Sequence, residues 1–435
     1  MVSDAAALSA YATLSSVTVA FDCGCRCAFC SLCEHSGCNV SVPLAVKSTG
    51  GLFMKKALVL AGGGARGSYH IGVWQALREM EYKFDIVTGT SVGSLNGTLV
   101  ALDDFDVAKS MWLSIQDRDV MDIPQKVISH DTVDFLKNLA KDKGISLSPL
   151  EAMITRFVDE DKVRASECRY GLVTVNVNTR KAEELTIDEI PQGKLVDYML
   201  ASSGWVPFLQ PRNIDGQVYI DGGFYDNLPS NLAARMGADE IIEVDLDSMG
   251  FERPLKEEYS HIKVTRISSW NDLGSFLEFN PEAAKRNISL GYLDAYKAFG
   301  KLEGKVYAFK KGETDKIYAD FGMQLMERCE EVYHRHTPVK LAAEVYNHTE
   351  RRNPKTLNDK FLAVLEGAML AADAPVEEVY TAENIKKYLV HAKENVFGSI
   401  FTPLADNRTA AKLLSKLEAI DIRKVYLRLA QNIIL

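Results

Sequence analysis

The stretch FDIVTGTSVGSLNGTLVAL, residues 84–102, carries a serine between two glycines directly after an apolar run. Residues 84–88 have the length and apolar character of a buried strand, and residues 94–102 are predicted to form the helix that follows. A serine at such a strand-to-helix turn is exposed, and the glycines let neighbouring backbone pass close to it. The positive end of the helix dipole favours negative charge at the same place. We therefore predict a nucleophile elbow, with Ser91 as the candidate catalytic residue and Gly89 and Gly93 beside it.

A second strand–turn–helix signal lies upstream. The apolar run at residues 56–61 leads into GGGARG, and apolar residues at helical spacing follow over residues 68–80. Glycines let successive backbone N–H groups converge on an anion, and the start of the helix adds its dipole. In a hydrolase such N–H groups would hold an oxyanion. The candidate oxyanion-hole residues are Gly62, Gly63, Gly64, Ala65, Arg66 and Gly67.

The same glycine spacing is also that of a dinucleotide-binding fingerprint. That interpretation requires an acidic residue at the end of the second strand, where it would bind a ribose hydroxyl. The second predicted strand instead ends in Thr88-Gly89-Thr90-Ser91 and has its acidic residue, Asp85, at the start. We therefore disfavour the dinucleotide alternative and expect no cofactor.

Asp221 is the candidate partner of the serine. It ends a third apolar run, residues 218–220, and is followed by Gly222 and Gly223, which permit a sharp turn. Sites in α/β proteins are built at this end of a strand. The nearby Asp215 precedes a glycine in a polar segment and is typical of a hairpin turn.

Taken together, GGGARG, GTSVG and DGG resemble, in this order and spacing, the motifs of the patatin-like phospholipases, serine hydrolases that cleave acyl esters of lipids. The resemblance covers roughly residues 55–309. It implies that Ser91 is the nucleophile, that Asp221 is its only partner and general base, and that residues 62–67 form the oxyanion hole. It also implies that DNLP, residues 226–229, is supporting structure. The implied activity is that of a lipid acyl hydrolase, a phospholipase A-type enzyme or esterase that works without a metal.

Two alternatives stay open. An α/β-hydrolase with a Ser-His-Asp triad also carries G-x-S-x-G but needs a histidine. His70 lies in the predicted helix after the glycine-rich loop, and the other histidines stand in segments without a catalytic motif, so we expect each to be a surface or packed residue. A non-catalytic lipid-binding or partner-recruiting protein on the same fold would be expected to lose Ser91 or Asp221 first. The eight histidines are His35, His70, His130, His261, His334, His336, His348 and His391.

The composition restricts the class of partner. The chain has 435 residues with 47% hydrophobic and 25% charged residues, which suits a globular protein of two domains. A net charge of −9 argues against nucleic acid and against a polybasic membrane anchor. No uncharged apolar stretch has transmembrane length. We therefore expect a cytoplasmic protein whose lipid or acyl-ester substrate is met peripherally at a membrane surface or received free.

Three segments are predicted. Residues 1–53 contain six of the eight cysteines, including Cys27-x-x-Cys30-x-x-Cys33, but no second knuckle for a zinc site follows. We interpret them as a disordered extension or as a start assigned too far upstream, because Met54 immediately precedes the first core strand. Residues 54–311 are predicted to form a three-layer α/β/α catalytic domain around a mostly parallel sheet.

Residues 312–435 are predicted to form a helical appendage without strands. Packing, homo-oligomerisation and contact with a lipid surface are its candidate roles. Within the catalytic domain, Trp205, Phe208 and Leu209 are candidates either for an acyl pocket or for ordinary core.

Overall fold

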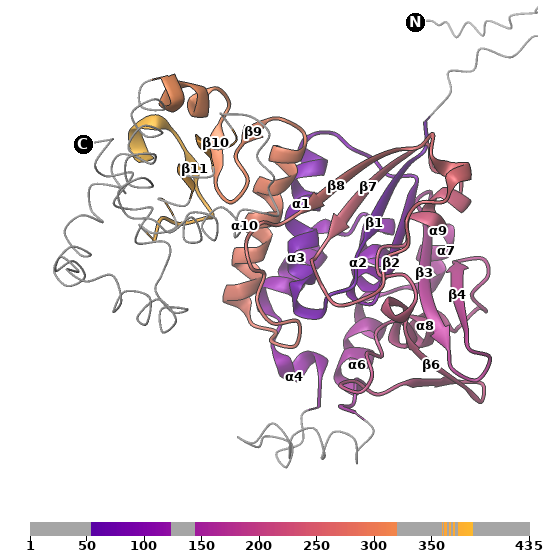
Figure 1. Ribbon diagram of the computed structural model, residues 1–435. Helices are drawn as coiled ribbons and strands as arrows, with labels where there is room; N and C mark the ends of the chain where they lie inside the picture. The colour runs from indigo at the N-terminus through magenta and orange to yellow at the C-terminus, as the bar shows by residue number, and fades with distance from the viewer. Residues whose placement is uncertain are drawn as a thin grey trace, which may run out of the picture. The chain divides into compact units, whose positions relative to one another are not determined.

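The computed structural model describes residues 54–122, 144–319, 359, 361–362, 365–366, 369 and 373–385 (Figure 1). All of them belong to one unit, Phe53–Leu435. The cysteine-rich segment 1–53 and most of the predicted helical appendage lie outside the described residues, so their predicted roles stay predictions.

An eight-stranded sheet forms the centre of the fold, with β5-β6-β3-β2-β1-β7-β8 as the order of neighbours and β4 paired with β3 off this path. The neighbours in β3-β2-β1-β7-β8 pair in parallel, whereas β4 and β6 run antiparallel to β3. The predicted mostly parallel sheet is confirmed. The strands are β1 Lys56–Leu60, β2 Ile86–Thr90, β3 Arg169–Asn176, β4 Lys181–Thr186, β5 Arg212–Ile214, β6 Gln217–Asp221, β7 Glu240–Asp245 and β8 Lys263–Ser268.

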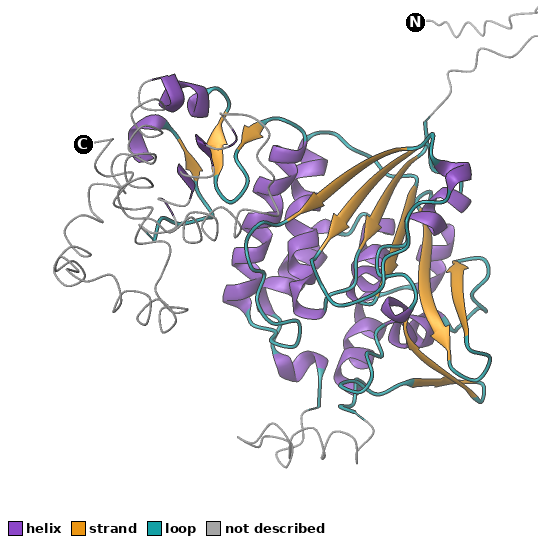
Figure 2. Cartoon of the chain, viewed as in Figure 1, coloured by secondary structure: helices purple, strands orange, loops and turns teal. Residues whose placement is uncertain are grey.

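Helices cover the sheet on both faces, giving the three predicted layers (Figure 2). Helices α1, α2, α3 and α10 contact one another on one face, and α9 packs on β1, β2 and β7 on the other. The Tyr69 hydroxyl donates to Asp294 Oδ2 at 2.8 Å, which ties α1 to α10. The helices are α1 Ser68–Glu79, α2 Val92–Ala101, α3 Phe105–Ser114, α4 Asp117–Val120, α6 Ser148–Phe157, α7 Glu160–Ala165, α8 Leu195–Ser202, α9 Ser230–Arg235 and α10 Pro281–Ala298.

Short 3-10 turns follow two of the strands, η1 Gly64–Gly67 and η2 Gly222–Phe224, and a third, η3, spans Glu257–Tyr259. The first two turns are the glycine segments that the sequence singled out. Strand β2 extends to Thr90, two residues further than predicted, so that Ser91 lies directly between the strand and α2. Within the described part of the chain, the helices are too short or too polar to span a bilayer.

A second, three-stranded sheet contradicts one prediction. It consists of β9 Leu302–Glu303, β10 Ala308–Lys310 and β11 Val379–Tyr380 in the order β11-β10-β9, with β10 and β11 parallel. The expectation that no strand follows residue 312 is therefore wrong at Val379–Tyr380. A two-residue strand shows no alternating pattern in the sequence, because its conformation depends on the strand that it pairs with.

Candidate active site

Ser91 adopts a backbone conformation that L-residues rarely take, with φ 53° and ψ −126°. Its N–H donates to Ser202 Oγ at 2.9 Å, and its carbonyl accepts from the Ser94 N–H at 2.9 Å. The turn also requires glycine at position 93, since a Cβ there would collide with the backbone carbonyl of Leu60. The surrounding structure thus holds Ser91 in a strained turn at the amino end of α2, as the sequence predicted for a nucleophile elbow.

The glycine-rich loop after β1 has backbone N–H groups of two kinds. Those of Gly63 and Gly64 have no acceptor within the described part of the chain. Gly64 has φ 55° and lies against the carbonyl of Phe276, so a side chain there would be excluded as well as strained. Three of the other four N–H groups are used within the protein: Gly62 donates to the Asn227 carbonyl at 3.2 Å, Ala65 to the Phe276 carbonyl at 2.9 Å and Arg66 to the Gly63 carbonyl at 3.2 Å. Gly67 is the last residue of η1. Gly63 and Gly64 therefore combine an N–H without an acceptor in the described part of the chain with a place in the lining of the cavity that contains Ser91.

Two side chains set the direction of the Gly63 N–H. The carbonyl oxygen of Gly62 accepts from Asn227 Nδ2 at 3.4 Å and from the hydroxyl of Ser248. In a planar trans peptide the C=O and the N–H point in opposite directions, so fixing this oxygen also fixes the N–H of Gly63. Sequence reasoning took Asn227 only as part of a supporting stretch and missed Ser248, because no motif marks a serine that follows a strand.

Arg66 braces the glycine-rich loop. Its Nε donates to the Gly274 carbonyl at 2.8 Å, and its Nη1 donates to the Asp247 carbonyl at 2.6 Å and to that of Leu246 at 3.3 Å. The guanidinium thus joins the loop after β7 to the loop before α10. Gly67 has a packing role, since a Cβ there would meet the side chains of Val92 and Trp112.

Asp221 ends β6 and is 1% exposed. Its Oδ1 accepts from the Gly223 N–H at 2.7 Å, whereas its Oδ2 is buried without a hydrogen-bond partner of normal geometry. Burial raises the pKa of this carboxyl to about 7, and the Gly223 N–H and the nearby Ser91 hydroxyl oppose the rise. A carboxyl with such a pKa is half ionised near neutral pH, which suits a proton acceptor.

The other two aspartates near this turn are placed differently. Asp215 lies in the β5–β6 hairpin at φ 49° and pairs with Lys194 at 2.9 Å, so the predicted hairpin turn is confirmed. Asp226 is buried, and burial raises its pKa to about 7, but it does not line the cavity that contains Ser91. Its Oδ1 accepts from the N–H groups of Leu228 and Arg253, both at 3.3 Å.

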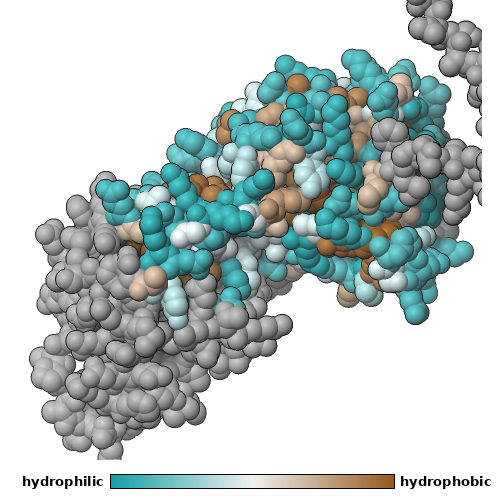
Figure 3. Space-filling model, turned by 90° about the horizontal axis from the view of Figure 1, so that it is seen from above, coloured by the Kyte–Doolittle hydropathy of each residue, from teal (hydrophilic) through white to brown (hydrophobic). Residues whose placement is uncertain are grey.

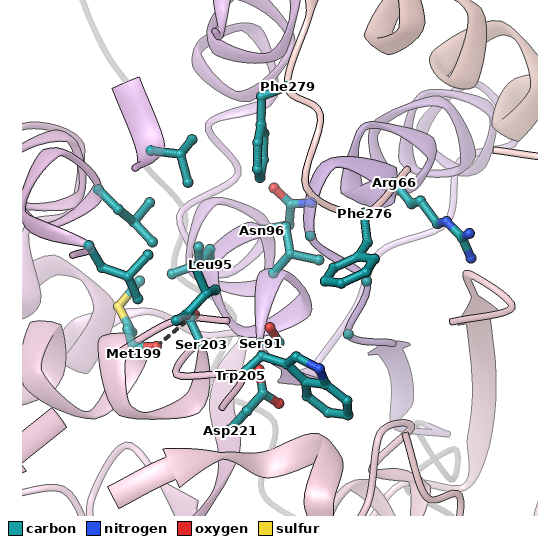
Figure 4. A pocket seen from close by; sticks show the side chains of 18 of the residues that line it. Arg66, Ser91, Leu95, Asn96, Met199, Ser203, Trp205, Asp221, Phe276 and Phe279 are labelled. Atoms are coloured by element: carbon teal, nitrogen blue, oxygen red, sulfur yellow. Dashed lines mark hydrogen bonds between the residues drawn. The ribbon is translucent and has the colours of Figure 1, made fainter. Parts of the chain in front are cut away.

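Ser91 and Asp221 line a cavity of about 390 Å³ together with Gly63 and Gly64. Figure 4 shows the Ser91 hydroxyl next to the Asp221 carboxyl, with the Trp205 ring in front. Trp205 and Leu209 line the cavity, as the pocket interpretation predicted, whereas Phe208 does not. Beyond the polar end, apolar side chains from α2, α3, α4, α6 and α8 form much of the wall, among them Leu95, Leu99, Met111, Val120, Leu150, Met153, Ile154 and Met199. Ile115, directly after α3, also lines it.

No described histidine lines this cavity. His70 is buried in α1, where its Nδ1 lies 3.2 Å from Asn96 Nδ2, and burial lowers its pKa to about 3. His261 is exposed near the start of β8. The remaining six histidines lie outside the described residues.

Comparison with known proteins agrees with the sequence motifs. The family model of patatin-like phospholipases matches residues 58–234, which confirms the resemblance over these residues. Mouse patatin-like phospholipase domain-containing protein 6 is 34% identical over 205 residues, or 44% of this chain and 13% of that protein. Lysophospholipase NTE1 of Saccharomyces cerevisiae is 28% identical over 296 residues, or 64% of this chain and 16% of that protein. The chain thus corresponds to a small part of these relatives' length.

Among solved structures, the chain is similar to VipD from Legionella pneumophila, with 14% sequence identity and a TM-score of 0.37. The similarity covers 87% of this chain and 90% of VipD.

Proposed function

We propose that the patatin-like part of this chain is a lipid acyl hydrolase, a phospholipase A-type enzyme or esterase, in which Ser91 and Asp221 act as a dyad. One observation carries the proposal. A strained, glycine-flanked Ser91 lies beside a buried carboxyl whose pKa is about 7, at the polar end of an apolar cavity. A serine hydroxyl is a weak nucleophile, so it needs both such exposure and such a base.

In the first half-reaction, Ser91 Oγ attacks the ester carbonyl carbon while its proton passes to Asp221 Oδ2, the oxygen without a partner. The carbonyl oxygen becomes an oxyanion that accepts from the N–H groups of Gly63 and Gly64. Each such donor is typically worth about 10² to 10³ in rate. Collapse of the intermediate breaks the ester bond, the alcohol leaves with the proton held by Asp221, and Ser91 keeps the acyl group.

In the second half-reaction, a water molecule replaces the alcohol. Asp221 accepts one of its protons as the water oxygen attacks the acyl-enzyme carbonyl, and Gly63 and Gly64 stabilise the second oxyanion. Collapse then breaks the bond to Ser91 Oγ, which takes back the proton from Asp221, and the free acid leaves.

The shape and chemistry of the cavity support an acyl chain as the group that it holds. Its wall beyond Ser91 is lined by aliphatic, methionine and aromatic side chains, many of them from five helices. An acyl chain placed there leaves water, which stabilises binding by about 0.8 kcal/mol per buried CH₂. The lipid head group, by contrast, would lie toward the exposed side of Ser91.

The decisive experiment combines a fluorophosphonate probe with a panel of acyl esters and phospholipids. We expect the probe to label the full chain at Ser91 and Ser91→Ala to abolish both labelling and turnover. His70→Asn tests for a Ser-His-Asp triad. If the variant folds, its ester turnover should stay within about tenfold of that of the unsubstituted chain. Loss of turnover in His70→Asn equal to that in Ser91→Ala, with an unchanged melting temperature, would mean that a histidine is the base.

A further inference from the structure

Two large apolar side chains project into solvent beside the cavity. Phe251 is 67% exposed and Met249 is 60% exposed, more than any other large apolar residue of the described chain. Both belong to residues 247–253, which follow β7 and which we call the mouth loop. Met249 also lines the cavity that contains Ser91, so the exposed apolar surface is continuous with the cavity interior.

The exposure of Phe251 is built into the structure. Its N–H donates to the Gly223 carbonyl at 2.8 Å, and its carbonyl accepts from the Asn227 N–H at 2.6 Å. Arg253 adds two further ties, since its N–H donates to Asp226 Oδ1 at 3.3 Å and its Nε donates to the Tyr225 carbonyl at 3.1 Å. These bonds hold the mouth loop against the turn that carries Asp221, so the backbone cannot withdraw the two side chains into the protein.

Aromatic rings extend the apolar surface around the cavity. Trp205 and Phe276 line the cavity, and Phe224 stacks on Trp205 with ring centroids 4.5 Å apart. Figure 3 shows the molecule from above, where the hydrophobic areas, in brown, are separated by hydrophilic side chains. The other exposed large apolar residues of the described chain are less exposed and do not line the cavity, for example Val107 on α3 and Val264 on β8. Scattered exposed apolar residues are normal on a protein surface, whereas exposed apolar side chains next to an apolar cavity mark an interaction site.

We propose that the mouth loop inserts Phe251 and Met249 into the surface of an aggregated lipid, so that an acyl chain passes from the lipid into the cavity without crossing water. This inference rests on the proposed function and adds where the protein meets its substrate. The chain carries a net charge of −9, so general attraction to anionic lipids does not drive the contact. Insertion of apolar side chains into an uncharged lipid surface drives the contact instead. Phosphatidylcholine, which has no net charge, forms such a surface.

The test measures vesicle binding without turnover. The full chain with Ser91→Ala is co-sedimented with phosphatidylcholine vesicles, and Phe251→Gln is added to it. We expect Phe251→Gln to lower the partition coefficient by about tenfold or more, because a large apolar side chain no longer leaves water. Val264→Gln, which replaces a singly exposed apolar residue away from the cavity, is the matched control and should bind as before.

A second measurement excludes a purely structural effect. In the chain with Ser91 intact, Phe251→Gln should lower turnover of phosphatidylcholine in vesicles and leave turnover of a short soluble ester within about twofold. Absence of vesicle binding, equal loss in Val264→Gln, or equal loss on the soluble ester would overturn the inference. Vesicle binding through Phe251 in a chain that hydrolyses no ester would instead overturn the proposed function and leave the lipid contact standing.

Discussion

A buried carboxylate lies at each of the two sheets, and the two are held in opposite ways. At the end of β6, Asp221 receives one backbone N–H on Oδ1, and its Oδ2 is left without a partner. Beside the three-stranded sheet, Glu366 is 0% exposed and its Oε1 accepts the N–H groups of Lys305, Val306 and Tyr307 at 2.6, 2.9 and 3.2 Å. Asp221 therefore keeps one oxygen that can accept a proton, whereas Oε1 of Glu366 accepts three backbone N–H groups.

This difference separates the carboxylate that we propose as the base from one that stabilises the fold. A buried acid with an open oxygen has a raised pKa and can exchange a proton with a neighbour. A buried acid that accepts several backbone N–H groups instead ties segments together. Glu366 lies beyond the predicted boundary at residue 312 and accepts from residues before it, so the predicted boundary does not separate this residue from the small sheet.

The largest effect is expected for Asp221→Asn. The variant has nearly the same volume but no base, so ester turnover should fall by about 10³-fold. Its folded state should be no less stable at pH 8, because the raised pKa shows that ionised Asp221 lowers stability there. Steady-state kinetics and thermal melting measure the two quantities. Retention of more than about a tenth of the turnover would assign the base to another group.

The pH dependence of turnover should identify the same group. Asp221 acts as a base only when ionised, so kcat/KM should rise about tenfold per pH unit up to its pKa of about 7 and then level off. Between pH 5 and pH 7 the rise is about 50-fold. Asp226→Asn is the matched control, since it removes the other buried carboxyl with a pKa of about 7 and should leave this acid limb in place. Disappearance of the limb in Asp226→Asn would transfer the titration to Asp226.

Glu366→Ala tests the structural carboxylate. It removes the acceptor of three backbone N–H groups, so the free energy of unfolding should fall by about 2–4 kcal/mol. Urea denaturation measures the loss, and fluorophosphonate labelling of Ser91 under native conditions should persist. Glu377→Ala removes a half-exposed ion pair with Arg286 and should cost less than about 1 kcal/mol. Equal costs for the two variants would refute the structural role of Glu366.

Ser248→Ala should have the smallest effect. Without its hydroxyl, the Gly62 carbonyl keeps only the longer bond from Asn227, and the Gly63 N–H is held less firmly toward the oxyanion. We expect kcat to fall by about tenfold with little change in KM, because the loss arises in the transition state. Ser248→Thr should restore part of the rate, and Ser289→Ala on the exposed face of α10 should leave it unchanged. A rise in KM alone would indicate a role in substrate binding.

The sequence by itself determined the elements that carry Ser91, the glycine-rich loop and Asp221. Residues 56–60, 86–90 and 217–221 are strands, and their glycine turns follow directly. Such features are local, because apolar periodicity, glycine chemistry and strand-to-helix turns act over a few neighbouring residues. The order of the motifs was therefore sufficient for the fold class, and the local turn signals were sufficient to place Asp215 in a hairpin and Asp221 at a strand end.

Only the tertiary structure decided which backbone N–H groups remain free, what pKa Asp221 has, and where β11 pairs. Asn227 and Ser248 reach the Gly62 carbonyl from 165 and 186 positions away, and β11 takes its conformation from β10. The cavity likewise requires walls from five helices distributed along the chain. Burial and hydrogen bonding between distant segments set these properties, and no local pattern in the sequence encodes which segments meet.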